Sequence, residues 1–353
     1  MAMTLGEIAR LVGGTIVRGE ACLPIASAAT LDTASAADVT LVDSRDKLHS
    51  LAKSAAAAAI VPTGSGSLDR PSIEVADVHA AFAAVIACFR PPRVAPPRGV
   101  SPQASVDPAA RVSADTEIHP FATVGPDCEI GPGVTIHSGA RLMAGCRIGA
   151  GTTIFPNAVL YENTIVGARC IIHACAVLGA NGFGYKVADD RYVLSAQLGQ
   201  VELGDDVEVG AATTIDRGTY GPTRIGDGTK LDNLVMIAHN CRLGRHNMIC
   251  SQVGVAGSTT TGDWVVMAGQ VGVRDHVHIG DKAVLGARSG VSCDIEPGRT
   301  VLGEPAIDVR DRKLQLATIS KLPEMRKELK ELGFRIQALE RASAGPATLP
   351  DAA

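Results

Sequence analysis

The chain has 353 residues, of which 38 are glycine and only 3% are aromatic, and its net charge at pH 7 is −4. This length allows more than one domain, and the lack of an overall positive charge argues against nucleic-acid binding. Residues 1–10 contain no uninterrupted apolar core, so we expect no signal peptide. No apolar run is long enough to span a membrane. Nine cysteines without a CxxC pair indicate reduced thiols and a cytoplasmic protein.

Residues 1–98 are predicted to form a separate small α/β domain, because apolar residues there alternate between helical and strand spacing. The expected elements are an amphipathic helix ended by Gly13-Gly14, three strands and a second helix, at residues 5–12, 15–17, 40–42, 59–61 and 78–89. A proline-rich segment, 90–98, follows and cannot continue a helix. We interpret it as a stiff linker.

From Val100 to Leu178 an aliphatic residue occupies every sixth position, fourteen times without exception. The repeat resumes at Leu203, slips by four residues across 218–221, and continues to Val291. A period of six fits neither a helix face nor a simple alternating strand, and it is typical of a parallel β-helix of hexapeptide repeats. Three hexads close one triangular coil, and stacked coils bury the aliphatic residues. Known hexapeptide β-helices are left-handed, so residues 99–307 are predicted to form a left-handed parallel β-helix in a mainly β protein.

An insertion interrupts the repeat between Leu178 and Leu203, and it begins with Asn181, Phe183 and Tyr185 among several glycines. Such an insertion must leave the coil as an external loop. A loop that carries aromatic residues on a rigid scaffold is a candidate ligand flap. The alternative interpretation is a plug that only fills space.

Residues 308–353 are predicted to form C-terminal α-helices and a tail, with residues 343–353 disordered. A heptad seam, with Pro323 in a first helical turn, predicts self-association or docking along the end of the β-helix; it consists of Leu322, Met325, Leu329, Leu332, Ile336 and Leu339. Nine Lys and Arg side chains stand against five Asp and Glu between residues 310 and 341. This excess suits an acidic partner, or alternatively a solvated helix face.

His239 stands out within the repeat because it has a glycine, Gly257, 18 residues further along. One coil also takes 18 residues, so the two residues are expected on adjacent coils about 4.8 Å apart. A base beside a glycine N–H suits acyl transfer, in which the base deprotonates the nucleophile and the N–H binds the oxyanion. His276 lies two coils and one position after His239. Asp232 lies one hexad before His239, where it would orient the His239 ring.

Other histidines are weaker candidates. His119, His137 and His173 share one column of the coil, which would hold their rings parallel rather than converging on a metal as zinc requires. His246 and His278 are expected to be inert surface residues. No P-loop, GxGxxG turn or nucleophilic serine motif occurs. We therefore expect direct transfer without a metal, a cofactor or a covalent intermediate.

Three segments, NGFGY at 181–185, TTIDRG at 213–218 and Asp232-Asn233 with IAHN at 237–240, resemble the UDP-3-O-acylglucosamine N-acyltransferases of lipid A biosynthesis. The order of N-terminal domain, β-helix and terminal helices is similar as well, so the resemblance covers about residues 3–340. It implies a homotrimer with active sites in clefts between β-helices. These enzymes move a 3-hydroxyacyl chain from acyl carrier protein to the 2-amine of the UDP-sugar.

The resemblance also assigns roles to single residues. It implies that His239 is the general base, that the Gly257 N–H binds the oxyanion, and that His276, Asp232 and Asn233 support catalysis or bind substrate. Asn181, Phe183 and Tyr185 are expected to shape the substrate site, and the basic terminal helices to receive the acidic carrier.

The N-terminal domain is expected to hold the uracil by resemblance. Residues 41–48 lack the aromatic side chains that commonly stack on it in this family. Contact from Leu41 and packing of the Lys47 stem are expected to replace them. Three alternatives stay open at the level of sequence. They are a UDP-GlcNAc O-acyltransferase, a γ-carbonic-anhydrase-like metalloenzyme and a β-helix without chemistry.

Overall fold

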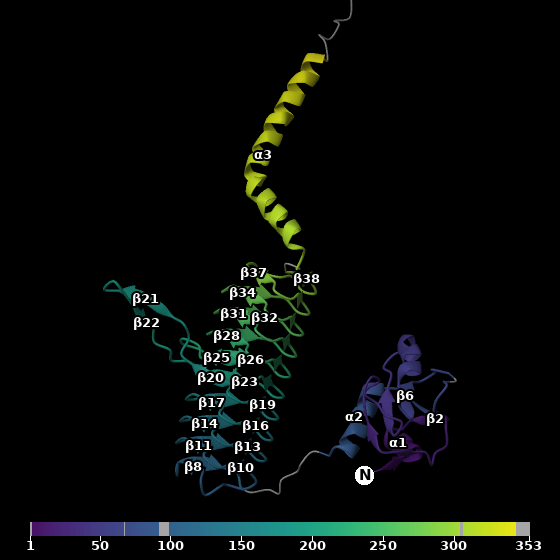
Figure 1. The fold of residues 1–353 in the computed structure, drawn as a ribbon. Helices are drawn as coiled ribbons and strands as arrows, with labels where there is room; N and C mark the ends of the chain where they lie inside the picture. Colours follow the sequence, from purple (N-terminus) through teal and green to yellow (C-terminus); the bar gives the residue numbers. More distant parts are fainter. Residues whose placement is uncertain (1, 67, 92–98, 304–305, 344–353) are drawn as a thin grey trace, which may run out of the picture. The chain divides into compact units, whose positions relative to one another are not determined.

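The computed structural model describes residues 2–66, 68–91, 99–303 and 306–343 (Figure 1). By its internal contacts the chain divides into two compact units, Met1–Pro96 and Pro97–Ala353. Most of the expected linker at 90–98 and almost all of the expected disordered tail at 343–353 lie outside the described residues.

The N-terminal unit contains a five-stranded sheet in the order β2-β7-β6-β5-β4, in which only β2 is antiparallel to its neighbour. These strands are β2 Thr15–Arg18, β4 Ser27–Ala28, β5 Asp38–Leu41, β6 Ala58–Pro62 and β7 Ser72–Val75. A separate pair is formed by β1 Met3–Thr4 and β3 Pro24–Ile25, and the helices are α1 Leu5–Leu11, the 3-10 helix η1 Arg45–Lys53 and α2 Val78–Phe89. A capping box between Thr4 and Glu7 starts α1. Apolar residues of α1, α2 and the sheet share one core.

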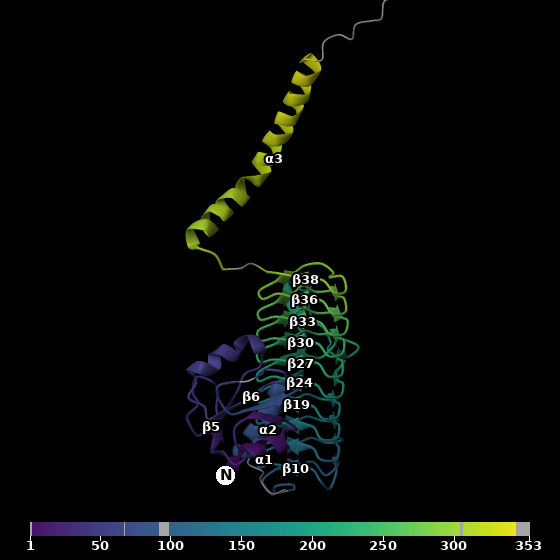
Figure 2. The same cartoon turned by 90° about the vertical axis from the view of Figure 1, so that its right-hand side faces the viewer.

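The second unit is the predicted left-handed parallel β-helix, whose coils stack three parallel sheets (Figure 2). The first face consists of β8 Ser105–Val106, β11 Thr123–Val124, β14 Arg141–Leu142, β17 Val159–Leu160, β20 Val177–Ala180, β25 Thr214–Asp216, β28 Met236–Ile237, β31 Gly254–Val255, β34 Gly272–Val273 and β37 Gly290–Val291. The second face consists of β9 Arg111–Val112, β12 Glu129–Ile130, β15 Arg147–Ile148, β18 Ile165–Val166, β23 Val201–Leu203, β26 Thr223–Ile225, β29 Arg242–Leu243, β32 Thr260–Thr261 and β35 His278–Ile279. The third face consists of β10 Glu117–Ile118, β13 Thr135–Ile136, β16 Thr153–Ile154, β19 Ile171–Ile172, β24 Glu208–Val209, β27 Lys230–Leu231, β30 Met248–Ile249, β33 Val266–Met267, β36 Val284–Leu285 and β38 Thr300–Val301.

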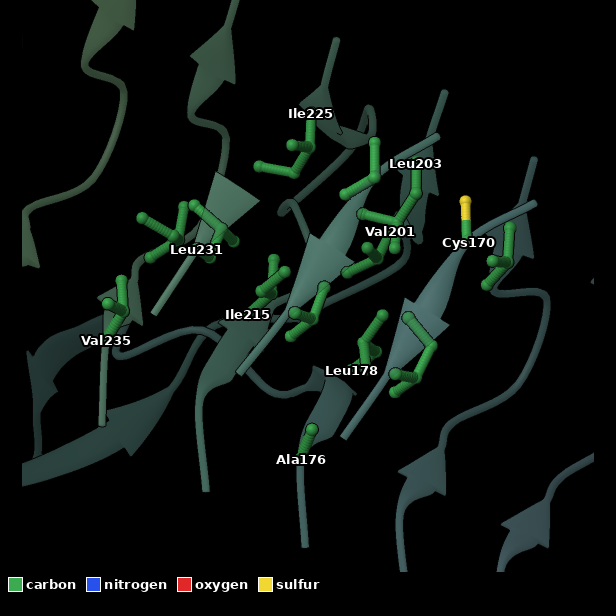
Figure 3. Packing of buried hydrophobic residues seen from close by; sticks show 14 of the residues in the cluster. Cys170, Ala176, Leu178, Val201, Leu203, Ile215, Ile225, Leu231 and Val235 are labelled. Carbon is green, nitrogen blue, oxygen red and sulfur yellow. The ribbon is translucent and has the colours of Figure 1, made fainter. Parts of the chain in front are cut away.

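The second residue of almost every hexad strand points inward and is buried, which is why the aliphatic period is six. Figure 3 shows Leu178 and Ile215 of the first face and Leu231 of the third face together in this core. The chain turns sharply between faces, and many turns place a residue in the left-handed region, for example Asn240 at a φ of 61° and Ser258 at 62°. We call the turn from the first to the second face the first corner, and the turn from the third face back to the first the third corner.

Both irregularities of the repeat leave the stack intact. Ile165 pairs with Glu202 across the insertion, and Thr214 pairs with Met236 across the four-residue slip. The insertion is an external loop, as predicted, and the structure shows that it starts at the first corner. It forms an antiparallel hairpin of β21 Tyr185–Ala188 and β22 Arg191–Leu194, which projects from the coil (Figure 1).

The C-terminal part differs from the expectation of several helices. A single helix, α3 Val309–Ser343, carries the whole heptad seam, and the prediction that Pro323 begins a helix is wrong because Pro323 lies inside α3. A proline in a helix interior removes one backbone hydrogen bond and crowds the carbonyl four residues earlier, yet α3 continues on both sides of Pro323. All apolar side chains of the seam are exposed in the single chain. No helix among the described residues is long and apolar enough to cross a membrane.

Candidate functional site

His239 and Gly257 lie next to each other on successive coils at the first corner, as their spacing predicts. A Cβ built on Gly257 would stand 2.6 Å from Cε1 and 2.9 Å from Nε2 of His239. The imidazole therefore occupies the space that any side chain at position 257 would need. Gly257 is buried, and its N–H donates to no acceptor among the described residues.

Asn240 fixes the protonation pattern of the His239 ring. Its Oδ1 lies 3.0 Å from Nδ1 of His239 and also accepts hydrogen bonds from the backbone N–H and the hydroxyl of Thr219, at 3.1 and 3.0 Å. A backbone N–H can only donate, so the atom facing His239 must be the amide oxygen. Nδ1 of His239 then carries the proton in the neutral ring. Nε2 keeps its lone pair, as a general base requires.

The four-residue slip at 218–221 makes this arrangement possible. Thr219 lies within the slip, and a repeat without extra residues would have no loop there to reach Asn240. Thr223, which follows the slip, accepts a hydrogen bond from the Asn240 N–H at 2.9 Å. The four-residue slip therefore holds Asn240, the hydrogen-bond partner of His239, in place.

The root of the inserted hairpin covers the other side of His239. A Cβ on Gly182 would stand 2.5 Å from Cβ of His239, so only glycine allows the loop this close approach. The same Cβ would be 2.9 Å from Oε1 of Gln197, an oxygen that is buried without a hydrogen-bond partner. The Gln197 amide group is oriented by its Nε2, which donates to the Ser195 carbonyl at 3.2 Å.

Asp216 is a buried acid on the coil before His239. It is only 4% exposed, and its carboxylate accepts no hydrogen bond from the described residues. Burial raises the pKa of Asp216 to about 6, and the nearby His239 acts in the opposite direction. The adjacent Arg217 does not neutralise it, since that guanidinium binds the Gly179 carbonyl and Glu162.

His276 lies at the same corner but is separate from the His239 ring. Its backbone N–H donates to the Gly257 carbonyl at 3.1 Å, which places it one coil beyond Gly257. Its ring is largely exposed and has Asp275 as its nearest acid, at 4.0 Å. The described residues contain no contact between the His276 and His239 rings.

Asp232 and Asn233 lie at the third corner, and the expectation that Asp232 orients His239 within one chain is wrong. The Asp232 carboxylate instead accepts from the backbone N–H of Asn233 at 2.7 Å and of Ser251 at 3.0 Å, and from the Ser251 hydroxyl. The Ser251 hydroxyl is the first reason why the pKa of Asp232 lies below its usual value. Asn233 uses its Oδ1 to bind the Ala211 N–H. The first-face strand β28 separates this corner from His239.

The three substrate residues expected in the insertion differ in their surroundings. Asn181 and Phe183 flank Gly182 and are exposed, with Phe183 84% accessible. Its ring meets that of Tyr185 edge to face at 5.1 Å. The structure therefore places Phe183 one residue from the His239 contact, whereas Tyr185 already belongs to the projecting hairpin.

In the N-terminal unit, Leu41 and Lys47 lie around the carboxyl end of β5. Leu41 is half-buried against the core of this unit, and Lys47 forms an ion pair with Asp43 at 3.0 Å. His79 of α2 faces the same carboxylate at 3.8 Å. Lys47 is exposed, and the contact the structure gives it is this ion pair with Asp43.

The histidine column expected at the third corner exists, but its rings are not all parallel. The rings of His119 and His137 meet edge to face with centroids 4.6 Å apart, whereas Phe155 stacks between His137 and His173 at 4.9 and 5.2 Å. No group of three or more potential metal ligands occurs among the described residues.

Reasoning from the sequence missed Asn240, Thr219, Asp216 and Gln197 as neighbours of His239. A signal was present for the first three, because Asn240 lies in the IAHN segment, Asp216 in TTIDRG, and Thr219 in the slip. Gln197 carries no such signal, since only the folded insertion brings it to this corner.

Two family models match stretches of the β-helix. Residues 100–196 match the family model of the GMPPB C-terminal domain, and residues 222–257 match that of the bacterial transferase hexapeptide (six repeats). The UDP-N-acetylglucosamine O-acyltransferase (LpxA) structure from Moraxella catarrhalis RH4 has 26% identity and a TM-score of 0.47, and the match covers 69% of this chain and 93% of that one.

Several curated relatives match this chain, and two of those named below extend over nearly all of it. The UDP-3-O-acylglucosamine N-acyltransferase of Rhodopirellula baltica is 58% identical over 172 residues, which are 48% of this chain and 45% of that protein. The protein of the same name from Methylobacterium sp. (strain 4-46) is 41% identical over 91% of this chain and 93% of its own length. That from Anaeromyxobacter dehalogenans (strain 2CP-C) is 44% identical over 97% of this chain and 98% of its own length. The chain therefore belongs to the family of UDP-3-O-acylglucosamine N-acyltransferases.

Proposed function

We propose that this protein transfers a 3-hydroxyacyl chain from acyl carrier protein to the 2-amine of UDP-3-O-acylglucosamine. The observation that carries the proposal is the pairing of His239, whose Nε2 is left with a lone pair, with the unengaged N–H of Gly257. The name of the curated relatives supports the acceptor. The family resemblance supports the carrier-bound donor, and no cofactor is required.

The reaction follows from this pairing. Nε2 of His239 takes a proton from the amine as its nitrogen attacks the thioester carbonyl carbon, and a C–N bond forms. The carbonyl oxygen becomes an oxyanion that accepts a hydrogen bond from the Gly257 N–H. When the intermediate collapses, the C–S bond breaks and the carrier thiolate takes the proton from His239. The products are the N-acylated sugar nucleotide and free carrier thiol.

An assay with two acceptors tests the activity. The purified protein is incubated with 3-hydroxyacyl carrier protein and either UDP-3-O-acylglucosamine, which has a free amine, or UDP-N-acetylglucosamine, which has only hydroxyl groups to acylate. We expect transfer to the free amine only. Transfer to the N-acetyl acceptor would favour the O-acyltransferase alternative.

We also propose that the active site is shared between chains of a homotrimer. Asp232 and Asn233 lie at the third corner and His239 at the first, with strand β28 between them. All of them can serve one substrate only when the third corner of one chain meets the first corner of another. His276, exposed at the first corner, would then face the same cleft.

Mixed oligomers test the shared site. We expect His239→Ala and Asn233→Ala to be nearly inactive alone and to recover transfer when the two chains are co-expressed, because some clefts then combine two intact corners. The control pair is His239→Ala with Gly257→Ala, whose altered residues lie at the same corner of one chain and cannot complement. Lack of recovery in purified mixed oligomers of the first pair would contradict a shared site.

A shallow hollow on the first face is proposed to hold the acyl chain. Its volume is about 610 Å³, and it begins beside the site at Ala238 and Ala256. The outward positions of three successive strands are glycine there, at Gly254, Gly272 and Gly290, so the surface is smooth and apolar. An extended hydrocarbon chain matches such a surface.

The far end of this hollow is expected to limit the length of the acyl chain that the protein prefers. We expect Gly290→Leu to lower kcat/KM for long acyl donors about 10-fold or more while short donors are retained, because the new side chain blocks the far end. Gly290→Ala is the matched control and should change the preference little. The measurement is transfer from a panel of carrier-bound donors of different chain lengths. An unchanged preference in Gly290→Leu would place the acyl chain elsewhere.

The remaining parts are assigned proposed partners. The carboxyl ends of parallel strands β5, β6 and β7 form the edge where ligands bind in open α/β sheets, and Leu41 and Lys47 lie at that edge as the proposed uracil site. The excess of Lys and Arg on α3 suits the acidic acyl carrier protein. We place the protein in the cytoplasm, in keeping with nine cysteines that are all free.

A further inference from the structure

Asp216 and His239 meet at the first corner on successive coils. Ile215 pairs with Ile237 in the parallel ladder, so Asp216 lies opposite Ala238, the residue directly before His239. On its other side Asp216 pairs with Ala180, at the start of the insertion that covers His239. Since neighbouring strands are about 4.8 Å apart, the carboxylate and the imidazole are close neighbours.

Among the described residues, no Lys or Arg side chain pairs with the Asp216 carboxylate. Arg217 is held by the Gly179 carbonyl at 2.7 Å and by Glu162 at 3.0 Å. The other titratable neighbour is the buried thiol of Cys241, whose pKa is raised to about 12 by burial first and by Asp216 as a further cause. His239 is therefore the group near Asp216 that can become a cation.

We infer that Asp216 is a positioning residue that stabilises His239 as an imidazolium when the ring takes the proton of the acceptor amine. A buried carboxylate without a partner is unfavourable in the resting protein, and it becomes favourable once the ring next to it is charged. The amide oxygen of Asn240, which lies 3.0 Å from Nδ1 of His239, adds to the same effect. The site is thus prepared in advance for the charge that the reaction creates. This role rests on the proposed function of His239 as the base.

The test is Asp216→Asn, which keeps the shape of the side chain and removes its charge. We expect kcat to fall about 10- to 100-fold with little change in KM, because a charge at this distance acts on the transition state. An ionised Asp216 favours the protonated ring, so its removal should move the acidic limb of the kcat/KM profile about one pH unit lower. A side chain that only fills space would not move this limb.

The stability of the Asp216→Asn protein is a second readout, and it should change in the opposite direction to the activity. The raised pKa of about 6 means that the folded chain holds a proton on Asp216 more tightly than the unfolded chain, in which aspartate ionises near pH 3.9. Stability is therefore lost as the pH rises from about 4 to 6. We expect Asp216→Asn to melt at a higher temperature than the wild type at pH 7–8, and at the same temperature near pH 4.

Asp189→Asn is the matched control, since it removes the same charge from the exposed tip of the inserted hairpin. It should leave kcat, the pH profile and the melting temperature unchanged. An Asp216→Asn protein with an unmoved acidic limb, or with a lowered melting temperature and a matching loss of activity, would overturn the inference. If His239→Ala kept its activity, the proposed function itself would fail, which is a separate result.

Discussion

Replacing His239 with alanine is expected to lower kcat by about 10²–10⁴-fold, the usual contribution of a general base. The effect should be so large because no other described side chain can take over the proton. Asn240 only accepts from Nδ1, and the ring of His276 does not contact that of His239. The measurement is the initial rate of N-acylation with saturating donor and acceptor. KM should change little, because the ring acts on the transition state.

His278→Ala is the control for this prediction. His278 is an exposed histidine of the β-helix that lies on the second face, and its Nδ1 is paired with the Thr260 hydroxyl at 2.9 Å. It should keep the wild-type rate. Near-wild-type transfer by His239→Ala would exclude His239 as the base, while both variants should retain the melting temperature of the wild type within a few degrees.

Gly257→Ala is expected to lower kcat by about 10²–10³-fold, comparable to the loss of one oxyanion donor. The backbone of Gly257 does not need the left-handed region, so alanine is sterically allowed except for the His239 ring. The new methyl group would stand 2.6 Å from Cε1, and real carbon atoms do not approach so closely. The ring must turn, which moves Nε2 and weakens the hydrogen bond that Nδ1 donates to Oδ1 of Asn240. Single-turnover kinetics would show the loss in the chemical step.

Gly269→Ala is the matched control, because a Cβ there finds its nearest neighbour, the Ser251 carbonyl oxygen, at an ordinary 3.6 Å. We expect it to keep full activity and full stability. If Gly257→Ala also kept full activity, the close approach of position 257 to the His239 ring would not matter for catalysis. A Gly257→Ala protein that fails to fold would be recognised by its melting curve and circular dichroism.

The sequence alone determined the β-helix and the pair at its centre. An aliphatic residue every six positions can be buried only by a triangular coil, and a coil of 18 residues places Gly257 on His239 by counting. The insertion after Leu178 had to leave the coil for the same reason. These predictions depend on the period, which the sequence shows directly, and not on the direction of single side chains.

Some neighbours of His239 were decided by the tertiary structure. Asp232 precedes His239 by only seven residues, yet a strand turns the chain by one corner between them, and its carboxylate binds Ser251 instead. Asp216 and Gln197 are far from His239 in sequence and reach it because the slip and the insertion change the offset between coils.

At the C-terminal end, too, one feature was predictable from the sequence and another was decided by the structure. The heptad seam was readable as a period, and the structure confirms that it lies on a helix. The spacing does not predict that α3 continues through Pro323. The local cost of the proline is balanced by the stability of the helical residues on both sides, and the period contains no information on that balance. For this protein, periodic spacing determined which residues share a face or a column. The contacts of single polar side chains depend on loop conformation and on burial, and only the folded chain decides those.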